Sequence, residues 1–271
     1  MQNTITFSRA DDPWFRRGVM RSVEILTGQK RLQRLYDRYL STRQPNDIFW
    51  QSAIDYLRLT VRYDPARLAN IPKTGPLIVV ANHPFGVLDG LAIGYLVHQV
   101  RTDFKVLANA VLGRAEVFRP YLIPIEFDGL SSALRSNVMA KRETLAHLRT
   151  GGAIIVFPAG GVSTAQSPFG PATDAPWKLF TGKLIEASGA TVVPIYFEGQ
   201  NGPLFHFVSK FSQALREALI LREVAKKIND EIVAHVGQPV PHETLMALPT
   251  RQALLDFLRT QVYHLGTPQP A

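Results

Sequence analysis

Residues 76–90 of the chain read PLIVVANHPFGVLDG. The apolar run at 76–81 has the length and β-branched content of a buried strand. Residues 91–97, LAIGYLV, indicate a largely buried helix. His83 and Asp89 therefore stand in the turn between a strand and a helix, among glycines that allow the backbone to approach a ligand. Loops at this position commonly carry the chemistry of α/β proteins.

The alternation of strand and helix continues along the chain. Short apolar runs predict strands at 77–81, 104–108, 122–127, 153–157 and 192–197, with weaker ones at 204–208 and 232–240. Helical patterns occur at 88–100, 132–149, 177–188 and 251–264. We therefore predict an α/β fold whose mainly parallel central sheet is covered by helices on both faces.

The N-terminal part has a different pattern, which predicts helices only from Asp12 to about Tyr63. Its apolar residues recur at helical spacing, interrupted at Gly28, and many arginines lie among them. Basic amphipathic helices with aromatic residues are typical of a membrane surface, although such faces also suit packing on the protein body. We predict an N-terminal amphipathic helical region at 1–70, acting in membrane association, and an α/β domain at 71–271.

Composition excludes several kinds of chemistry. The 271 residues, 46% of them hydrophobic, suffice for one large domain with at most a small extension. The chain has no cysteine, which excludes disulfides, thiolate nucleophiles and cysteine-type zinc sites. We expect no secretory signal and no transmembrane helix. A net charge of +8 favours an anionic partner, such as nucleic acid, anionic lipid or a phosphorylated carrier, but is also compatible with a basic soluble protein.

His83 and Asp89 suit general base catalysis. An imidazole takes a proton from a hydroxyl at neutral pH when a carboxylate fixes its tautomer. The turn between the two residues is short enough for Asp89 to fold back onto His83. A histidine beside a carboxylate is often structural, but the strand-turn-helix position favours a site. We predict that this pair is catalytic and that Asn82 and Gly86 support it.

A second loop, FPAGGVST at 157–164, directly follows another predicted strand. Gly160 and Gly161 expose backbone N–H groups, and Ser163 and Thr164 add hydroxyls, so the loop can hold an anion. A plain glycine turn would look the same, but its position at the carboxyl edge of the sheet favours a site. We predict that these four residues bind an anion and that Pro158 supports the loop.

Two further segments follow predicted strands. Residues 108–120 supply Arg114 and Arg119, either of which can clamp a phosphate or carboxylate, although surface arginines are common. Residues 193–202 end a strand in a polar turn that either lines an acyl pocket or only terminates the strand. The Gly-x-Ser-x-Gly, Gly-x-Gly-x-x-Gly and His-Glu-x-x-His motifs are all absent from the sequence.

Four blocks in this order resemble the PlsC-type lysophospholipid and glycerolipid acyltransferases. The blocks are Asn82-His83 with Asp89, Gly113-Arg114 through Arg119, Phe157-Pro158-Ala159-Gly160, and Val193-Pro194-Ile195. Three segments are most similar to the hemolysin-like or lyso-ornithine-lipid acyltransferase branch: NHPFGVLDG, WKLFTGKL and GATVVPIYFEGQN. The resemblance covers roughly residues 72–202.

The sequence departs from the family pattern in two places. Five residues separate His83 from Asp89, where the family usually has four, and the longer spacing is a feature of the hemolysin-like branch. Ala159 stands where the third block usually has a glutamate, so acceptor binding through that carboxylate does not carry over.

The resemblance implies an O-acyltransferase that transfers a fatty acyl group from acyl-ACP or acyl-CoA to the hydroxyl of a lysolipid of lysophosphatidate or lyso-ornithine-lipid type. His83 is then the general base, oriented by Asp89, while Arg114 or Arg119 holds an anionic head group. The resemblance also implies that the acceptor binds at the second loop, through Gly160, Gly161, Ser163 and Thr164. No cofactor, metal or covalent enzyme intermediate is required. The expected partners are an acyl carrier protein or CoA thioester, a lysolipid and an anionic membrane surface, for a bacterial enzyme peripheral on the cytoplasmic face of the cell membrane.

Two other functions fit parts of the sequence. If the protein binds lipid on the same scaffold without catalysis, the replacement of the family glutamate by Ala159 is explained. A nucleic-acid binder would explain the charge, but the aromatic residues occupy apolar-periodic positions rather than a stacking platform beside the arginines, so no nucleic acid is expected.

Overall fold

The computed structural model describes residues 28–125, 131–211 and 213–267. The part of the predicted N-terminal helix before Gly28 lies outside these residues, as does the end of the strand predicted at 122–127.

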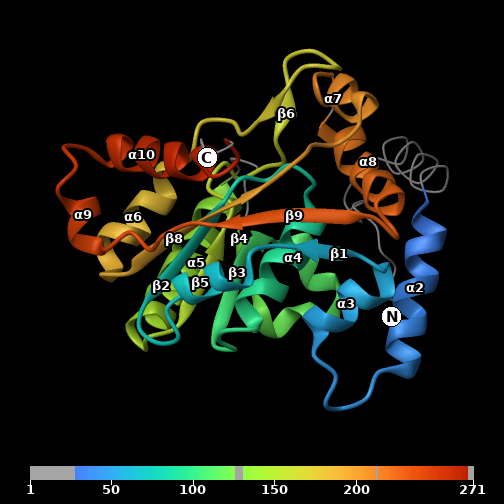
Figure 1. Cartoon of the computed structure of the whole chain (residues 1–271), viewed down its shortest axis with the longest axis horizontal. Coiled ribbons are helices and arrows are strands. Elements are labelled where there is room, and N and C mark those ends of the chain that lie inside the picture. The colour runs from blue at the N-terminus through green and yellow to red at the C-terminus, as the bar shows by residue number, and fades with distance from the viewer. Residues whose placement is uncertain (1–27, 126–130, 212, 268–271) are drawn as a thin grey trace.

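Within the described residues a seven-stranded sheet forms the centre of the molecule (Figure 1). Its strands, in spatial order, are β1 (Thr60–Arg62), β9 (Glu231–Val236), β8 (Thr191–Phe197), β2 (Leu77–Ala81), β5 (Ala153–Val156), β3 (Phe104–Asn109) and β4 (Leu122–Ile125). All neighbours run parallel except β8 and β9, which are antiparallel. The predicted α/β fold with a mainly parallel sheet is therefore confirmed.

Helices cover both faces of the sheet. Side chains alternate along each buried strand, so each strand contributes apolar residues to both faces. Leu77 and Val79 of β2 belong to a core shared with α3 (Phe49–Leu57), α4 (Val87–His98) and α8 (Gln213–Lys226). Ile78 and Val80 belong to a second core shared with α5 (Ser131–Arg149), α6 (Leu179–Ser188) and α10 (Arg251–His264). The four helices predicted in the α/β part correspond to α4, α5, α6 and α10.

The N-terminal helices pack on the body of the protein. These are α2 (Gln29–Thr42) and α3, and the fully buried Trp50 of α3 lies against Gly94 of α4. The prediction of helices only up to Tyr63 is wrong at 60–62. Arg58, in the left-handed region at φ 51°, ends α3, and Thr60–Arg62 then pair with β9 as strand β1. Membrane association of this region stays a prediction. Across the described ranges, no helix combines the length and apolar character needed to cross a membrane.

The strand predicted at 204–208 is wrong. These residues lie in α7 (Pro203–Ser209), which begins with a proline at its first turn, a favoured position for helix initiation. Short apolar runs do not distinguish a strand from a buried helix by pattern alone. Also outside the prediction are α8, the hairpin of β6 (Thr164–Ala165) and β7 (Ala172–Thr173), the short helix α9 (His242–Met246), and the 3-10 turns η1 (Pro65–Asn70), η2 (Ala110–Arg114) and η3 (Glu116–Tyr121).

Candidate active site

The site is built around the turn that joins β2 to α4. His83 follows β2 by two residues, and Asp89 lies in the first turn of α4. The distance from His83 Nδ1 to Asp89 Oδ2 is 3.0 Å. The same oxygen accepts hydrogen bonds from the backbone N–H groups of Phe85 (2.8 Å) and Gly86 (2.9 Å). The turn formed by the five intervening residues therefore folds back and brings the Asp89 carboxylate to the His83 ring.

Gly86 makes this closure possible. Its φ of +83° lies in a region that L side chains rarely adopt, and an added Cβ would lie 3.1 Å from the side chain of Val162. The loop at 157–164 thus approaches the His–Asp turn closely at a position without a side chain. The supporting role of Gly86 stays a prediction, and this close approach gives it a physical basis.

The environment of the pair orients the imidazole. Asp89 is fully buried, and this desolvation raises the pKa of its carboxyl, against the lowering effect of His83 and of the Phe85 and Gly86 N–H groups. The His83 ring stacks on Phe157 with centroids 4.0 Å apart and planes 23° apart. Since Nδ1 faces Asp89, Nε2 is the ring nitrogen that is left to accept a proton.

Asn82 ties the end of β2 to the end of β8. Its side-chain amide donates to the carbonyl of Phe197 (2.9 Å) and accepts from the N–H of the same residue (2.7 Å). The buried amide thus satisfies both backbone groups where the strands end. This holds the residue next to His83 in place.

A buried carboxylate that sequence reasoning missed, Asp174, joins the two predicted loops. Its Oδ1 accepts hydrogen bonds from the backbone N–H of His83 (3.2 Å) and from the hydroxyl of Ser163 (2.5 Å), while its Oδ2 accepts from Trp177 Nε1 (2.9 Å). The N–H of Ser163 in turn donates to the carbonyl of His83 (2.8 Å). No local motif marks Asp174, which lies 91 residues from His83 in the sequence.

Side chains of helix α10 hold the backbone of Asp174. The Asp174 N–H donates to the hydroxyl of Tyr263 (2.8 Å), and Arg259 Nη2 donates to the Asp174 carbonyl (3.1 Å). Burial, followed by the charge of Asp174, raises the pKa of Tyr263 to about 12, so this phenol is neutral at physiological pH. The backbone of His83 is therefore connected through Asp174 to the C-terminal helix.

The loop at 157–164, which is predicted to bind the acceptor, contains a tight turn. The N–H of Gly160 donates to the carbonyl of Phe157 (3.0 Å), and Gly160 has a φ of +72°. An added Cβ at Gly161 would lie 3.6 Å from Arg216 Nη2, so a guanidinium from α8 stands close to this turn. Thr164 begins β6 and pairs with Thr173. Acceptor binding by Gly160, Gly161, Ser163 and Thr164 stays a prediction, and the Ser163 proton is directed to Asp174.

Pro158 and Ala159 are both buried and make contacts within the protein. Pro158 is buried, and its carbonyl accepts from the Lys178 N–H (2.9 Å), which fixes the loop against the start of α6. Ala159 is also buried and belongs to the same core as Trp177. The position of the family glutamate is thus occupied here by a small core side chain.

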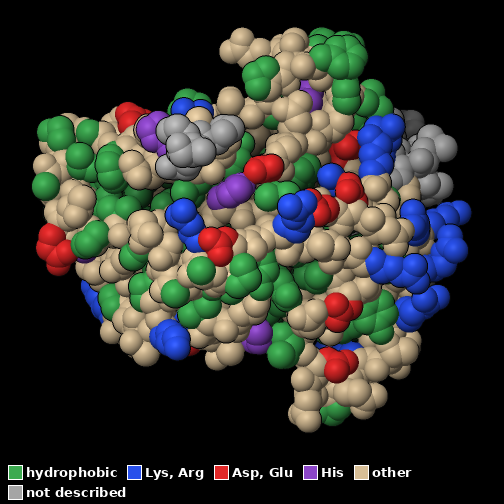
Figure 2. Space-filling model, in the orientation of Figure 1, with side chains coloured by type: hydrophobic (Ala, Val, Ile, Leu, Met, Phe, Trp, Pro, Cys, Tyr) green, Lys and Arg blue, Asp and Glu red, His purple; other side chains and the backbone are tan. Residues whose placement is uncertain are grey.

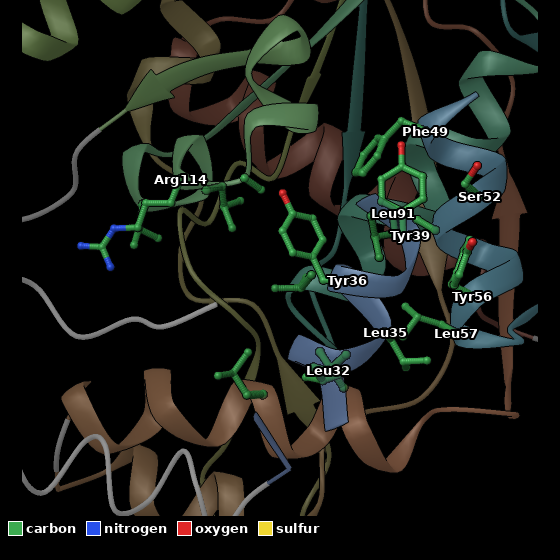
Figure 3. Close-up of a pocket in the computed structure, with 17 residues that line it drawn as sticks. Leu32, Leu35, Tyr36, Tyr39, Phe49, Ser52, Tyr56, Leu57, Leu91 and Arg114 are labelled. Atoms are coloured by element: carbon green, nitrogen blue, oxygen red, sulfur yellow. The ribbon is translucent and has the colours of Figure 1, made fainter. Parts of the chain in front are cut away.

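The two predicted arginines have different surroundings. Arg119 donates from Nε to the carbonyl of Gly113 (2.6 Å) and lies 4.0 Å from Glu116, so its guanidinium holds the turn between η2 and η3. Arg114 lines the rim of a pocket, and Figure 3 shows its guanidinium pointing away from the labelled pocket residues. Head-group binding by either arginine stays a prediction.

Figure 3 shows an apolar pocket of about 230 Å³. It is lined in part by α4, the helix whose first turn carries Asp89. Helices α2, α3, α4 and α8 and the turn η2 form its walls. Val87 and Leu91 of α4 line it, and Val87 follows Gly86, whose N–H binds Asp89. Residues 193–202 do not line this pocket: the first of them belong to β8, and Gly199 packs against Phe85. Among the side chains that the structure describes, no cluster of His, Asp and Glu suits a metal ion.

Known proteins resemble the chain in sequence and in fold. A family model described as Acyltransferase matches residues 45–267. Two curated relatives named lyso-glycine lipid O-acyltransferase, from Phocaeicola vulgatus and Bacteroides thetaiotaomicron, are 28% and 27% identical over 225 residues. These matches cover 78% of this chain and 78% and 80% of the relatives. The crystal structure of the 1-acyl-sn-glycerophosphate acyltransferase PlsC from Thermotoga maritima shares the fold, with a TM-score of 0.50, 18% identity and coverage of 95% of this chain and 91% of that one.

Proposed function

The chain belongs to the acyltransferase family, and we propose that it transfers a fatty acyl group from a thioester to the hydroxyl of a lysolipid, with His83 as general base. The resemblance to PlsC-type acyltransferases is confirmed by the family match and by the named relatives. The observation that carries the mechanism is the 3.0 Å contact between His83 Nδ1 and the buried Asp89 carboxylate, next to an apolar pocket.

In the proposed reaction His83 Nε2 removes the proton from the acceptor hydroxyl as the oxygen attacks the thioester carbonyl. The tetrahedral intermediate then collapses, the C–S bond breaks, and the departing thiolate takes the proton from the imidazolium. Asp89 stabilises the imidazolium that forms between these steps. The carboxylate is already desolvated and held by two backbone N–H groups, so little reorganisation accompanies proton transfer.

The apolar pocket suits a fatty acyl chain. Its lining is almost entirely carbon, which favours burial of methylene groups by about 0.8 kcal/mol each. Val87 in the wall of the pocket directly follows Gly86 of the His–Asp turn. We propose that a chain bound in the pocket has its carbonyl end near His83. Acyl-ACP and acyl-CoA both present such a chain, and both are proposed as donors.

The acceptor is proposed to be a lysolipid at the cytoplasmic surface of the cell membrane. The curated relatives are named for lyso-glycine lipid, which adds an amino-acid lysolipid to lysophosphatidate and lyso-ornithine lipid among the acceptors to test. The basic net charge of +8 supports an anionic partner for the protein surface.

The test is to compare wild type with His83→Ala on a panel of these three lysolipids, using labelled acyl-ACP and acyl-CoA and identifying the product by mass. Removal of the base is expected to lower turnover by at least about 100-fold. Circular dichroism and thermal unfolding check that the variant is folded, because the His83 ring stacks on Phe157 and pairs with the buried Asp89. The matched control is His264→Ala, which removes an exposed histidine at the end of α10. Wild-type turnover by a folded His83→Ala protein would contradict the mechanism.

A non-catalytic lipid-binding protein is the second candidate, favoured by Ala159 in place of the family glutamate. It predicts that wild type binds lysolipid without consuming either thioester. The same assay therefore distinguishes the two functions.

A further inference from the structure

Four large apolar side chains form an exposed ridge, which we define as Phe169, Leu204, Phe207 and Phe211. Their exposed fractions are 88%, 44%, 51% and 73%. Phe169 lies in the turn between β6 and β7, and the other three lie in α7 or just beyond it. Figure 1 places β6 and α7 on one projection, and Figure 2, in the same orientation, shows hydrophobic side chains on its surface. Large apolar groups clustered on a projection indicate a binding surface.

The ridge is held by a defined network. The N–H of Ala165 in β6 donates to Nδ1 of the buried His206 in α7 (3.3 Å), and Lys210 Nζ donates to the carbonyl of Gln166. Gln200 accepts from the Ala172 N–H (2.7 Å) and donates to the Gly170 carbonyl (3.0 Å), which fixes the hairpin to the loop after β8. The exposed aromatic residues are thus presented by one connected unit.

The ridge is continuous with the active site. Strand β6 begins immediately after Ser163, whose N–H donates to the carbonyl of His83 (2.8 Å). Both the hairpin and α7 follow strands of the parallel sheet, β5 and β8, so they leave the sheet at the same carboxyl edge as His83. A lipid held at the ridge is therefore on the catalytic side of the molecule.

The charge of the ridge favours a membrane as its partner. Residues 158–173 and 199–213 contain no Asp or Glu, and Lys210 is their only Lys or Arg. The carboxylate of Glu223 in α8 accepts from the Gly202 N–H before α7 (2.9 Å), but it is buried and paired with Arg222 and Lys226. Exposed aromatic side chains on segments that carry a cation and no carboxylate of their own suit insertion between anionic head groups. Four apolar side chains on a projection are few for a stable protein interface, which typically takes about 20–30 residues a side.

We propose that the ridge inserts into the surface of a lipid bilayer and positions the active site to take its acceptor from the membrane. This inference rests on the proposed function, because a lysolipid acceptor resides in such a surface.

The first experiment measures partition onto vesicles of phosphatidylcholine containing phosphatidylglycerol, by co-sedimentation of the full chain. The double variant F169S/F211S is expected to lower the partition coefficient at least about tenfold, because two phenyl groups lose burial. The matched control is V138S/M139S, which removes two apolar side chains of α5 that are 67% and 63% exposed and is expected to bind as wild type. Wild-type partition by F169S/F211S would overturn the proposal.

The second experiment separates membrane docking from catalysis. F169S/F211S is expected to keep wild-type turnover of a monomeric short-chain lysolipid and to lose about tenfold on a long-chain lysolipid embedded in vesicles. If wild type transfers no acyl group but vesicle binding still depends on the ridge, docking stands and the proposed function fails. If the substitutions change the oligomeric state in size-exclusion chromatography and leave vesicle binding unchanged, the ridge joins copies of the chain and the proposal is wrong.

Discussion

His83 is held at three points by residues from different parts of the chain. Asp89 Oδ2 contacts its ring, Asp174 Oδ1 accepts from its backbone N–H, and the N–H of Ser163 donates to its carbonyl. Only the first contact is local in sequence. At the scale of single residues, the imidazole therefore depends on one carboxylate for its tautomer and on another for the position of its backbone.

Replacing Asp89 by Asn tests the role of the first carboxylate. The amide oxygen can still accept from the Phe85 and Gly86 N–H groups, but the neutral side chain no longer stabilises an imidazolium. We expect Asp89→Asn to lower turnover by about 100- to 10,000-fold, measured with the lysolipid panel. The matched control is Asp256→Asn, at an exposed carboxylate of α10. Retained turnover in Asp89→Asn would show that the charge is dispensable.

The same substitution predicts a dependence of stability on pH. Burial raises the folded-state pKa of Asp89 above its ordinary value of 3.8, so the folded protein binds this proton more tightly than the unfolded chain. The associated stability is present below pH 3.8 and is lost as the pH rises through the folded pKa. Relative to Asp89→Asn, the unfolding free energy of wild type should fall as the pH rises across this window. Chemical denaturation over a pH series measures the difference, and a wild-type advantage that grows with pH would contradict it.

At the scale of elements, the contact between α3 and α4 depends on a glycine inside a helix. The ring of the fully buried Trp50 occupies the place where a Cβ of Gly94 would lie, 2.1 Å from its nearest ring atom. Glycine inside a helix costs about 0.5–1 kcal/mol relative to alanine. The close approach of the indole offsets this cost, and it places α3 against the helix that carries Asp89.

Two glycines of α4 allow a matched test of this packing. Gly94→Ala is expected to lower the unfolding free energy by about 1–3 kcal/mol or more, because Trp50 has to move. Gly90→Ala, in the same helix with no atom within 4 Å of the new Cβ, is expected to be neutral or to stabilise by up to about 1 kcal/mol. Urea denaturation of both variants measures the contrast. Equal effects would mean that helix propensity, and not Trp50, determines the outcome.

At the scale of the whole molecule, the apolar pocket exists only because separate elements meet. Residues of α2, α3, α4, η2 and α8 line it, and these elements span residues 29–226 of the chain. Ala53 is one of the small lining residues. Because these elements come from separate parts of the chain, the packed fold determines the size of the pocket. A larger side chain at one wall position should therefore change which acyl chain fits.

Ala53→Phe is expected to shorten the preferred acyl chain. The added ring displaces the last methylenes of a long chain, and losing about two of them costs about tenfold in kcat/KM. We expect the ratio of long-chain to short-chain thioester turnover to fall by that factor. Gln51→Phe adds the same ring at an exposed position of α3 and should leave the ratio unchanged. An unchanged ratio in Ala53→Phe would exclude the pocket as the acyl site.

The sequence by itself determined the α/β architecture and the pairing of His83 with Asp89. Both depend on local information: alternation and helical periodicity within short windows, and a turn short enough to return Asp89 to the ring. Local pattern was insufficient at 204–208, where an apolar run forms α7, and at 60–62, where a short segment becomes an edge strand because β9 lies beside it. Only the tertiary structure placed Asp174 beneath His83, assembled the pocket and exposed the ridge. Their positions follow from packing between segments far apart in sequence, which periodicity does not encode.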